Sequence, residues 1–156
     1  MIEEGNKFPE GTIRTKDQSG IKEISTQDYF ADKKVILFGL PGAFTGTCSQ
    51  QHLPSYLENA ETIRSKGYFI ACLAVNDPHV MKAWGEMSNV EGRIDMLSDS
   101  DCSITKALGV DKEFGAILGH RSKRYAMVIH DGVVEKLFVD DSGFNLSSAE
   151  NVLQNL

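Results

Sequence analysis

Apolar segments of strand length alternate with helical segments along most of the chain, and this order constrains the fold strongly. The predicted strands are Val35–Leu40, Phe69–Val75, Ile94–Leu97, Tyr125–Ile129 and Val133–Val139. Each is short and rich in apolar residues, as buried strands are. Asp131-Gly132 separates the last two and is a favoured two-residue hairpin turn, so we expect those two strands to pair antiparallel.

Helical periodicity lies between these strands. After Cys48, apolar residues recur at steps of three and four from Leu53 to Ile63, and Gly67 closes the segment. Shorter helices are predicted from Pro78 to about Met87, from Asp101 to Leu108, and from Ser147 to the end.

The order of elements predicts parallel pairing first and antiparallel pairing last. The expected fold class is α/β, with a mixed central sheet flanked by helices as in the thioredoxin-like fold. The first 30 residues, including a short helix from Ser25 to Phe30, are expected to form an N-terminal extension packed on that sheet. No repeat or linker interrupts the 156 residues, so we expect residues 1–156 to form a single domain.

Charge and apolar content exclude several functional classes. The chain has 16 Lys plus Arg against 22 Asp plus Glu, a formal net charge of -6, and no Lys/Arg-rich block. A nucleic-acid partner is therefore not expected. The apolar segments are far shorter than the roughly 20 residues that a membrane helix needs, and the opening Met-Ile-Glu-Glu does not resemble a secretory signal. We accordingly expect a soluble protein with no membrane partner.

The three cysteines, Cys48, Cys72 and Cys102, form no CxxC pair. Their odd number argues against a disulfide framework, and their spacing argues against structural zinc. The four histidines show no metal-ligand spacing and no glycine-rich phosphate loop is present, so no cofactor is expected. Free thiols suit a reducing compartment, and we expect a cytoplasmic location.

Cys48 directly follows a predicted buried strand and a turn built on Pro41 and Gly42, and should lie in the first turn of a helix. A helix start offers unpaired N–H groups and positive potential, both of which stabilise a thiolate. Thr45, about one turn earlier, brings a hydroxyl near the sulfur. The sequence therefore indicates a nucleophilic cysteine, although a small apolar filler in the core is the alternative.

Pro41, Thr45 and Cys48 form a Pro-x-x-x-Thr-x-x-Cys pattern, which resembles the active-site signature of the peroxiredoxins. The run from Gly39 to Ser49 is most similar to the type-II, peroxiredoxin-V-like branch. Further segments resemble the same branch in the same order, at His52–Tyr56, Ala71–Asp77, Met81–Gly85 and Arg121–Val128. The resemblance therefore covers nearly the whole chain.

This resemblance implies a thiol-dependent peroxidase that reduces hydrogen peroxide and organic hydroperoxides to water or alcohols. Cys48 would be the peroxidatic residue and would become a sulfenic acid. Thr45 would hold the peroxide, and Pro41 would screen the oxidised sulfur. Arg124 would enter the pocket, where a permanently charged guanidinium can stabilise both the thiolate and the charge that develops on oxygen. The other implied pocket residues are Gly42, Phe44, Gly46, Thr47, Ile117 and Leu118.

Some neighbouring residues allow other interpretations. Arg121 also precedes the strand that follows Arg124, but the match to the family favours Arg124 and leaves Arg121 as a solvated surface charge. Ile117 and Leu118 would form an apolar rim suited to organic hydroperoxides, or would pack in the core. His52, four residues after Cys48, is expected to have a surface or capping role.

The chain departs from the family pattern at two places. Gly46 stands where proline is usual, so we expect a helix start that frays more easily while the environment of the thiolate survives. Leu146 occupies the place of the C-terminal resolving cysteine of the animal proteins.

Regeneration of Cys48 is therefore open. Plant-type members resemble this chain in carrying a cysteine at the position of Cys72, a possible resolving residue, but it lies within a predicted buried strand and would need local unfolding. Cys102 is expected to be an ordinary thiol. In a one-cysteine cycle, glutathione with glutaredoxin, or thioredoxin, would reduce the sulfenic acid.

The resemblance also implies a homodimer formed through loops around the active site. Two other functions compete with the peroxidase. A thiol-disulfide oxidoreductase would share the fold but lacks its CxxC motif here, and a redox-sensing or chaperone-like protein would use oxidation of Cys48 as a signal. A Cys-His protease has no support from the placement of the histidines.

Overall fold

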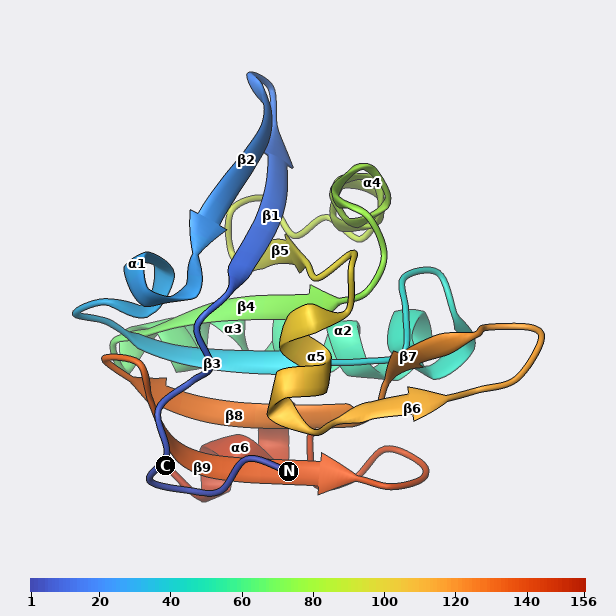
Figure 1. Ribbon diagram of the computed structural model, residues 1–156. Coiled ribbons are helices and arrows are strands. Elements are labelled where there is room, and N and C mark those ends of the chain that lie inside the picture. The colour runs from blue at the N-terminus through green and yellow to red at the C-terminus, as the bar shows by residue number, and fades with distance from the viewer.

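A seven-stranded mixed sheet runs through the computed structural model, which describes residues 1–156 (Figure 1). The strands lie in the order β2-β1-β5-β4-β3-β8-β9. Their bounds are β1 Thr12–Asp17, β2 Gly20–Ser25, β3 Lys34–Gly39, β4 Tyr68–Ala74, β5 Asp95–Ser98, β8 Arg124–His130 and β9 Val133–Asp140. A separate two-stranded ribbon, called the arm below, consists of β6 (Asp111–Glu113), β7 (His120–Ser122) and the loop between them.

Strand pairing follows the order expected from the sequence. β3, β4 and β5 pair parallel, whereas β8 runs antiparallel to β3 and forms a hairpin with β9. The α/β class and the thioredoxin-like arrangement, a mixed sheet flanked by helices, are thus confirmed. The helices are α1 Thr26–Phe30, α2 Leu53–Glu58, α3 Ala60–Ser65, α4 Pro78–Met87, α5 Ser103–Leu108 and α6 Ala149–Gln154, with a π-helical turn η1 at Cys48–His52. None of these helices is long and apolar enough to cross a membrane.

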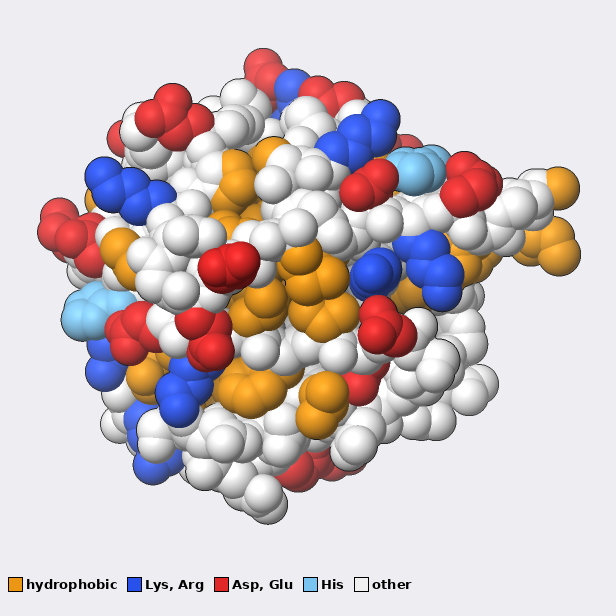
Figure 2. Space-filling view, turned by 60° about the horizontal axis from the view of Figure 1, so that its bottom comes forward, with side chains coloured by type: hydrophobic (Ala, Val, Ile, Leu, Met, Phe, Trp, Pro, Cys, Tyr) orange, Lys and Arg blue, Asp and Glu red, His pale blue; other side chains and the backbone are white.

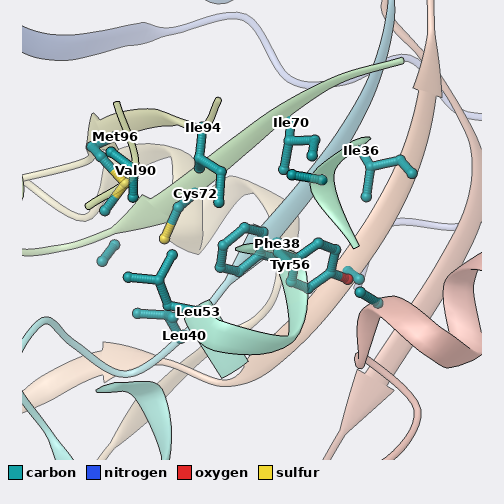
Figure 3. Close-up of a cluster of buried hydrophobic side chains, with 14 of the residues drawn as sticks. Ile36, Phe38, Leu40, Leu53, Tyr56, Ile70, Cys72, Val90, Ile94 and Met96 are labelled. Carbon is teal, nitrogen blue, oxygen red and sulfur yellow. The ribbon is translucent and has the colours of Figure 1, made fainter. Parts of the chain in front are cut away.

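β3 has apolar residues on both faces because helices cover both sides of the sheet. Ile36 and Phe38 point into a cluster that also contains residues of α2, α3, α4 and α6. Val35 and Leu37 point the other way, into a cluster with α1 and α5. Figure 3 shows the first cluster, where the rings of Phe38 and Tyr56 stack with centroids 4.1 Å apart. This packing fixes the end of β3, from which the loop to Cys48 departs.

The N-terminal segment does more than pack on the sheet. β1 and β2 form a hairpin, and β1 extends the sheet by pairing antiparallel with β5 at Arg14 and Ser98. This hairpin was not predicted from the sequence, because its strands are mostly polar and Ile13 is their only fully buried residue. The expected short helix is present, and Ser25 caps it by accepting a hydrogen bond from the Asp28 N–H.

The segment after Cys48 is not the continuous helix that its periodicity predicted. It begins with η1, in which the Leu53 N–H donates to the carbonyl of Cys48, five residues back. Pro54 has no N–H to continue a regular ladder at that point, and the wider turn accommodates it. Asn59, with φ -103° and ψ 6°, then separates α2 from α3.

Candidate active site

Cys48 lies where the sequence placed it, at the start of the helix that follows β3. Gly46 and Thr47 are already helical, and the Ser49 N–H donates to the carbonyl of Thr45 at 2.9 Å. Cys48 is therefore the third residue of the helical segment, where its backbone N–H and those of its neighbours lie at the positive end of the helix. Its side chain is only 1% exposed. The thiol is thus held in a dry, electropositive position.

Arg124 brings a permanent positive charge to this sulfur. Because β8 runs antiparallel to β3 and Tyr125 pairs with Gly39, the first residue of β8 lies beside the end of β3. The Nη2 group of Arg124 donates to Cys48 Sγ at 3.4 Å, and Nη1 lies 3.0 Å from Nδ1 of His52. Arg124 is itself only 9% exposed. The guanidinium therefore joins the thiol to a buried histidine.

His52 is part of the site, and the expected surface or capping role is wrong. It is fully buried, with its ring against Phe38, Tyr56 and Phe144. Burial, and then the charge of Arg124, lower its pKa from 6.5 to about 3, so the imidazole is neutral. Since an arginine only donates, Nδ1 accepts and the proton resides on Nε2, which has no hydrogen-bond partner. The signals in the sequence were the four-residue spacing from Cys48 and the resemblance of the segment His52–Tyr56 to the family.

Thr45 is the last residue of the loop before the helix, three residues before Cys48. The hydroxyl of Thr45 donates to the carbonyl of Gly42 at 2.7 Å, which leaves the lone pairs of its oxygen free to accept. The Ala43 N–H donates to Oδ1 of Asn76 at 2.8 Å. Phe44 has a φ of +61°, which is rare for a bulky residue, and its side chain is 51% exposed. The loop is thus held in one unusual conformation.

Arg121 is not the solvated surface charge that the sequence indicated. It is half-buried, with Nε donating to the carbonyl of Leu118 at 2.9 Å and Nη1 donating to the carbonyl of Pro41 at 3.1 Å. The structure therefore separates the two arginines: Arg124 contacts the sulfur, whereas Arg121 contacts the backbone of the loop.

A cavity of about 180 Å³ opens beside Arg124. Its walls are Pro41, Thr47, Lys112, Phe114, Lys123, Arg124, Asp140, Asp141, Ser142 and Gly143. Pro41, Thr47 and Arg124 were predicted to form the pocket and line this cavity. The other predicted site residues do not line it: Cys48, Thr45, Gly42, Phe44, Gly46, Ile117 and Leu118. Ile117 stands at the end of the arm, 94% exposed, so packing in the core of this chain is excluded for it. Phe114 provides the apolar wall of the cavity instead.

The segment after β9 covers His52. The carboxylate of Asp140 accepts hydrogen bonds from the N–H groups of Asn145, Leu146 and Ser147. Burial alone would raise the pKa of Asp140, but these hydrogen bonds outweigh it and hold the pKa below its ordinary value. The ionised Asp140 thus orders a turn that places Phe144 on the imidazole. Leu146, which the resemblance aligned with the C-terminal resolving cysteine, is 45% exposed.

Neither of the other cysteines resembles Cys48. Cys72 is fully buried on β4, beside Phe38, and burial raises the pKa of its thiol well above the ordinary value (Figure 3). Cys102 is 9% exposed, and burial followed by the charge of Asp99 raises the pKa of its thiol too. All three cysteines are free.

Gly46 occupies the first helical position, where proline is favoured. A Cβ at Gly46 would meet nothing within 4 Å. We therefore predict that Gly46→Pro raises the free energy of unfolding by about 0.4–1 kcal/mol, because it restricts the unfolded chain. Urea unfolding measures this, with Gly46→Ala as the control that adds a side chain but keeps the N–H. A Gly46→Pro variant less stable than the natural chain would contradict the prediction.

Comparisons with known proteins agree with this geometry. A family model described as Redoxin matches residues 3–153. Peroxiredoxin-2E, chloroplastic, of Arabidopsis thaliana is 43% identical over 99% of this chain and 69% of its own length. Peroxiredoxin-2B of the same plant is 41% identical over 97% of this chain and 96% of its own. A crystal structure of reduced Prx3 from Vibrio vulnificus in complex with hydrogen peroxide has a TM-score of 0.96, with 44% identity and 99% coverage of both chains.

The match to the family model and the relatives extend over almost the entire chain, and the solved structure has the same fold. The chain therefore belongs to the redoxin family, as a type-II peroxiredoxin, an enzyme that reduces peroxides with electrons from thiols.

Proposed function

We propose that Cys48 is the residue that carries out the peroxidase reaction. Its thiolate attacks one oxygen of the peroxide, a sulfur–oxygen bond forms, and the O–O bond breaks. The OH group stays on sulfur as a sulfenic acid, and the other oxygen leaves with the bonding electrons and takes a proton to become water or an alcohol. The observation that carries this proposal is the 3.4 Å contact between Arg124 Nη2 and Cys48 Sγ, since the same guanidinium can stabilise the thiolate and the leaving oxygen.

Thr45 and Pro41 support this reaction in the proposed scheme. Since the hydroxyl of Thr45 already donates to Gly42, its oxygen can accept the hydrogen of the peroxide and orient it toward the sulfur. Pro41 lines the cavity beside Arg124 and lacks an N–H, which suits it to screening the sulfur from water. The apolar ring of Phe114 in the same cavity suits organic hydroperoxides as well as hydrogen peroxide.

Trapping the sulfenic acid tests the assignment to Cys48. The protein receives one equivalent of hydrogen peroxide with dimedone present, and peptide mass spectrometry then locates the adduct. We expect the adduct on the peptide that contains Cys48. An adduct confined to Cys102 would overturn the proposal.

An external thiol is the proposed reductant, either glutathione with glutaredoxin or thioredoxin. Cys72 is fully buried with a raised pKa, so at neutral pH it is a protonated and inaccessible thiol, which is a poor attacking group. Cys102 likewise has a raised pKa. These features favour a one-cysteine cycle over an internal disulfide.

We predict that the Cys72→Ser, Cys102→Ser double variant keeps peroxide turnover with glutathione and glutaredoxin close to that of the natural chain. We expect this result because neither Cys72 nor Cys102 takes part in the proposed one-cysteine cycle. Coupled consumption of NADPH measures turnover, and mass spectrometry of the peroxide-treated natural chain should show a glutathione adduct. A Cys48–Cys72 disulfide, together with loss of turnover in the double variant, would refute the one-cysteine cycle.

A homodimer and a cytoplasmic location complete the proposal. The arm ends in exposed apolar side chains, seen at the right of Figure 2, and Ile117 there is 94% exposed. Phe44, in the loop beside Cys48, is 51% exposed, and a second copy would cover such surfaces. Sedimentation of a monomer at micromolar concentration would contradict the dimer.

The free thiols support a reducing location such as the cytoplasm, which cell fractionation tests.

A further inference from the structure

Arg121 connects the arm to the loop before Cys48. Its Nε group donates to the carbonyl of Leu118 in the arm, and its Nη1 group donates to the carbonyl of Pro41 in the loop. We propose that Arg121 is a positioning residue for the peroxide pocket, which acts by holding the Pro41–Gly42 backbone against the arm. This inference rests on the proposed role of Cys48 and concerns a residue that does not touch the sulfur.

The fit between Arg121 and the loop leaves little freedom. A Cβ at Gly42 would lie 2.3 Å from Nη1 of Arg121, so only glycine permits this approach. Asn76 holds the next residue, because its Oδ1 accepts the Ala43 N–H at 2.8 Å. The carbonyl of Asn76 in turn accepts the hydroxyl of Ser98 at 2.6 Å, which ties it to β5. The loop is therefore attached to the arm at Pro41 and to the sheet at Ala43.

The position of the Pro41–Gly42 backbone determines how the hydroxyl group of Thr45 is oriented. The carbonyl of Gly42 accepts the hydroxyl of Thr45 at 2.7 Å, and this bond decides which way the oxygen of Thr45 can accept. If Arg121 releases the Pro41 carbonyl, Gly42 can rotate and Thr45 loses its orientation. Pro41 itself lines the cavity beside Arg124, so its ring would move as well. A misplacement of about 1 Å can cost on the order of a hundredfold in rate.

A guanidinium suits this task better than an ammonium group. Its planar fork presents several donors in fixed directions, so Nε and Nη1 can serve two carbonyls at once. A lysine at position 121 would keep the charge but could not hold both Leu118 and Pro41 in this geometry. The proposal therefore predicts that charge alone does not replace Arg121.

The test measures how fast Cys48 reacts with hydrogen peroxide in the Arg121→Gln and Arg121→Lys variants. Trp84 is the single tryptophan, and its indole N–H donates to the hydroxyl of Ser49, next to Cys48, so its fluorescence can report the reaction in a rapid-mixing experiment. We expect the second-order rate to fall about tenfold or more in both variants. Arg64→Gln, an exposed arginine on α3 away from the pocket, is the matched control.

Two further readouts separate positioning from a general loss of structure. In an Arg121→Gly variant, added methylguanidine should restore part of the rate, which a globally damaged fold would not allow. The pH at which the rate reaches half its plateau should stay unchanged in all Arg121 variants, because Arg121 does not contact the sulfur. Rates equal to that of the Arg64→Gln control, or full recovery by Arg121→Lys, would overturn the proposal.

The experiments distinguish a wrong inference about Arg121 from a wrong assignment of Cys48. If dimedone labels Cys48 in the natural chain and the Arg121 variants react at the natural rate, only the inference about Arg121 is wrong. If dimedone does not label Cys48 in the natural chain, the proposed function itself is wrong.

Discussion

Replacement of Cys48 by serine should abolish peroxide consumption. A serine hydroxyl is hardly ionised at neutral pH, even beside a guanidinium, and neutral oxygen is a far weaker nucleophile toward peroxide than a thiolate. Sulfur is also the atom that must accept the transferred OH group. The substitution is nearly isosteric in a side chain that is 1% exposed, so the fold should be retained. Loss of hydrogen peroxide in the presence of dithiothreitol is the measurement, and the expected rate equals that of the reductant alone.

Cys102→Ser is the matched control for this experiment. Cys102 is another nearly buried cysteine, but its thiol is not in contact with an arginine, so the control should keep the rate of the natural chain. Circular dichroism and thermal unfolding of the Cys48→Ser variant verify that it is folded. Continued turnover by a folded Cys48→Ser variant would show that another residue attacks the peroxide.

The parts of the fold that the sequence predicted are those set by local patterns. β3 has the run Val35–Phe38, which is apolar throughout because helices cover both faces of the sheet. The Asp131-Gly132 turn fixed the β8–β9 hairpin, and α4 starts at Pro78 after the capping residue Asp77, as expected. The position of Cys48 followed from the same kind of pattern, a strand followed by a turn and a helix.

The parts that escaped prediction depend on distant contacts. Arm strands β6 and β7 have three residues each and no alternation of apolar residues, so only their mutual pairing reveals them. The burial of His52 requires the turn ordered by Asp140, which lies far away in the sequence. The family resemblance assigned Arg124 to the sulfur, as the structure has it, but the contacts of Arg121 with Leu118 and Pro41 join segments that are distant in the sequence and were not predicted.

Replacement of Arg124 by alanine should lower the rate of Cys48 oxidation on the order of 100- to 1000-fold, similar to the loss of an oxyanion donor in other enzymes. The reason is that Arg124 is the only side chain that donates to Cys48 Sγ, at 3.4 Å. Arg124→Lys should recover only part of the loss, because one ammonium group cannot serve both the sulfur and Nδ1 of His52. Stopped-flow oxidation by hydrogen peroxide is the measurement, with Arg64→Ala as the control for loss of an arginine elsewhere.

Replacement of His52, which contacts Arg124 Nη1, tests whether Arg124 acts alone or together with the imidazole. His52→Leu removes the acceptor for Arg124 Nη1, so the guanidinium can turn away from the sulfur, whereas His52→Asn keeps a neutral acceptor close to the position of Nδ1. We expect a loss of about tenfold for His52→Leu and recovery of most of the rate for His52→Asn. If His52 works through Arg124, then His52→Leu should cost little more in an Arg124→Ala background, because coupled residues are not additive. Additive losses would instead mean that the imidazole contributes to the reaction by a route of its own.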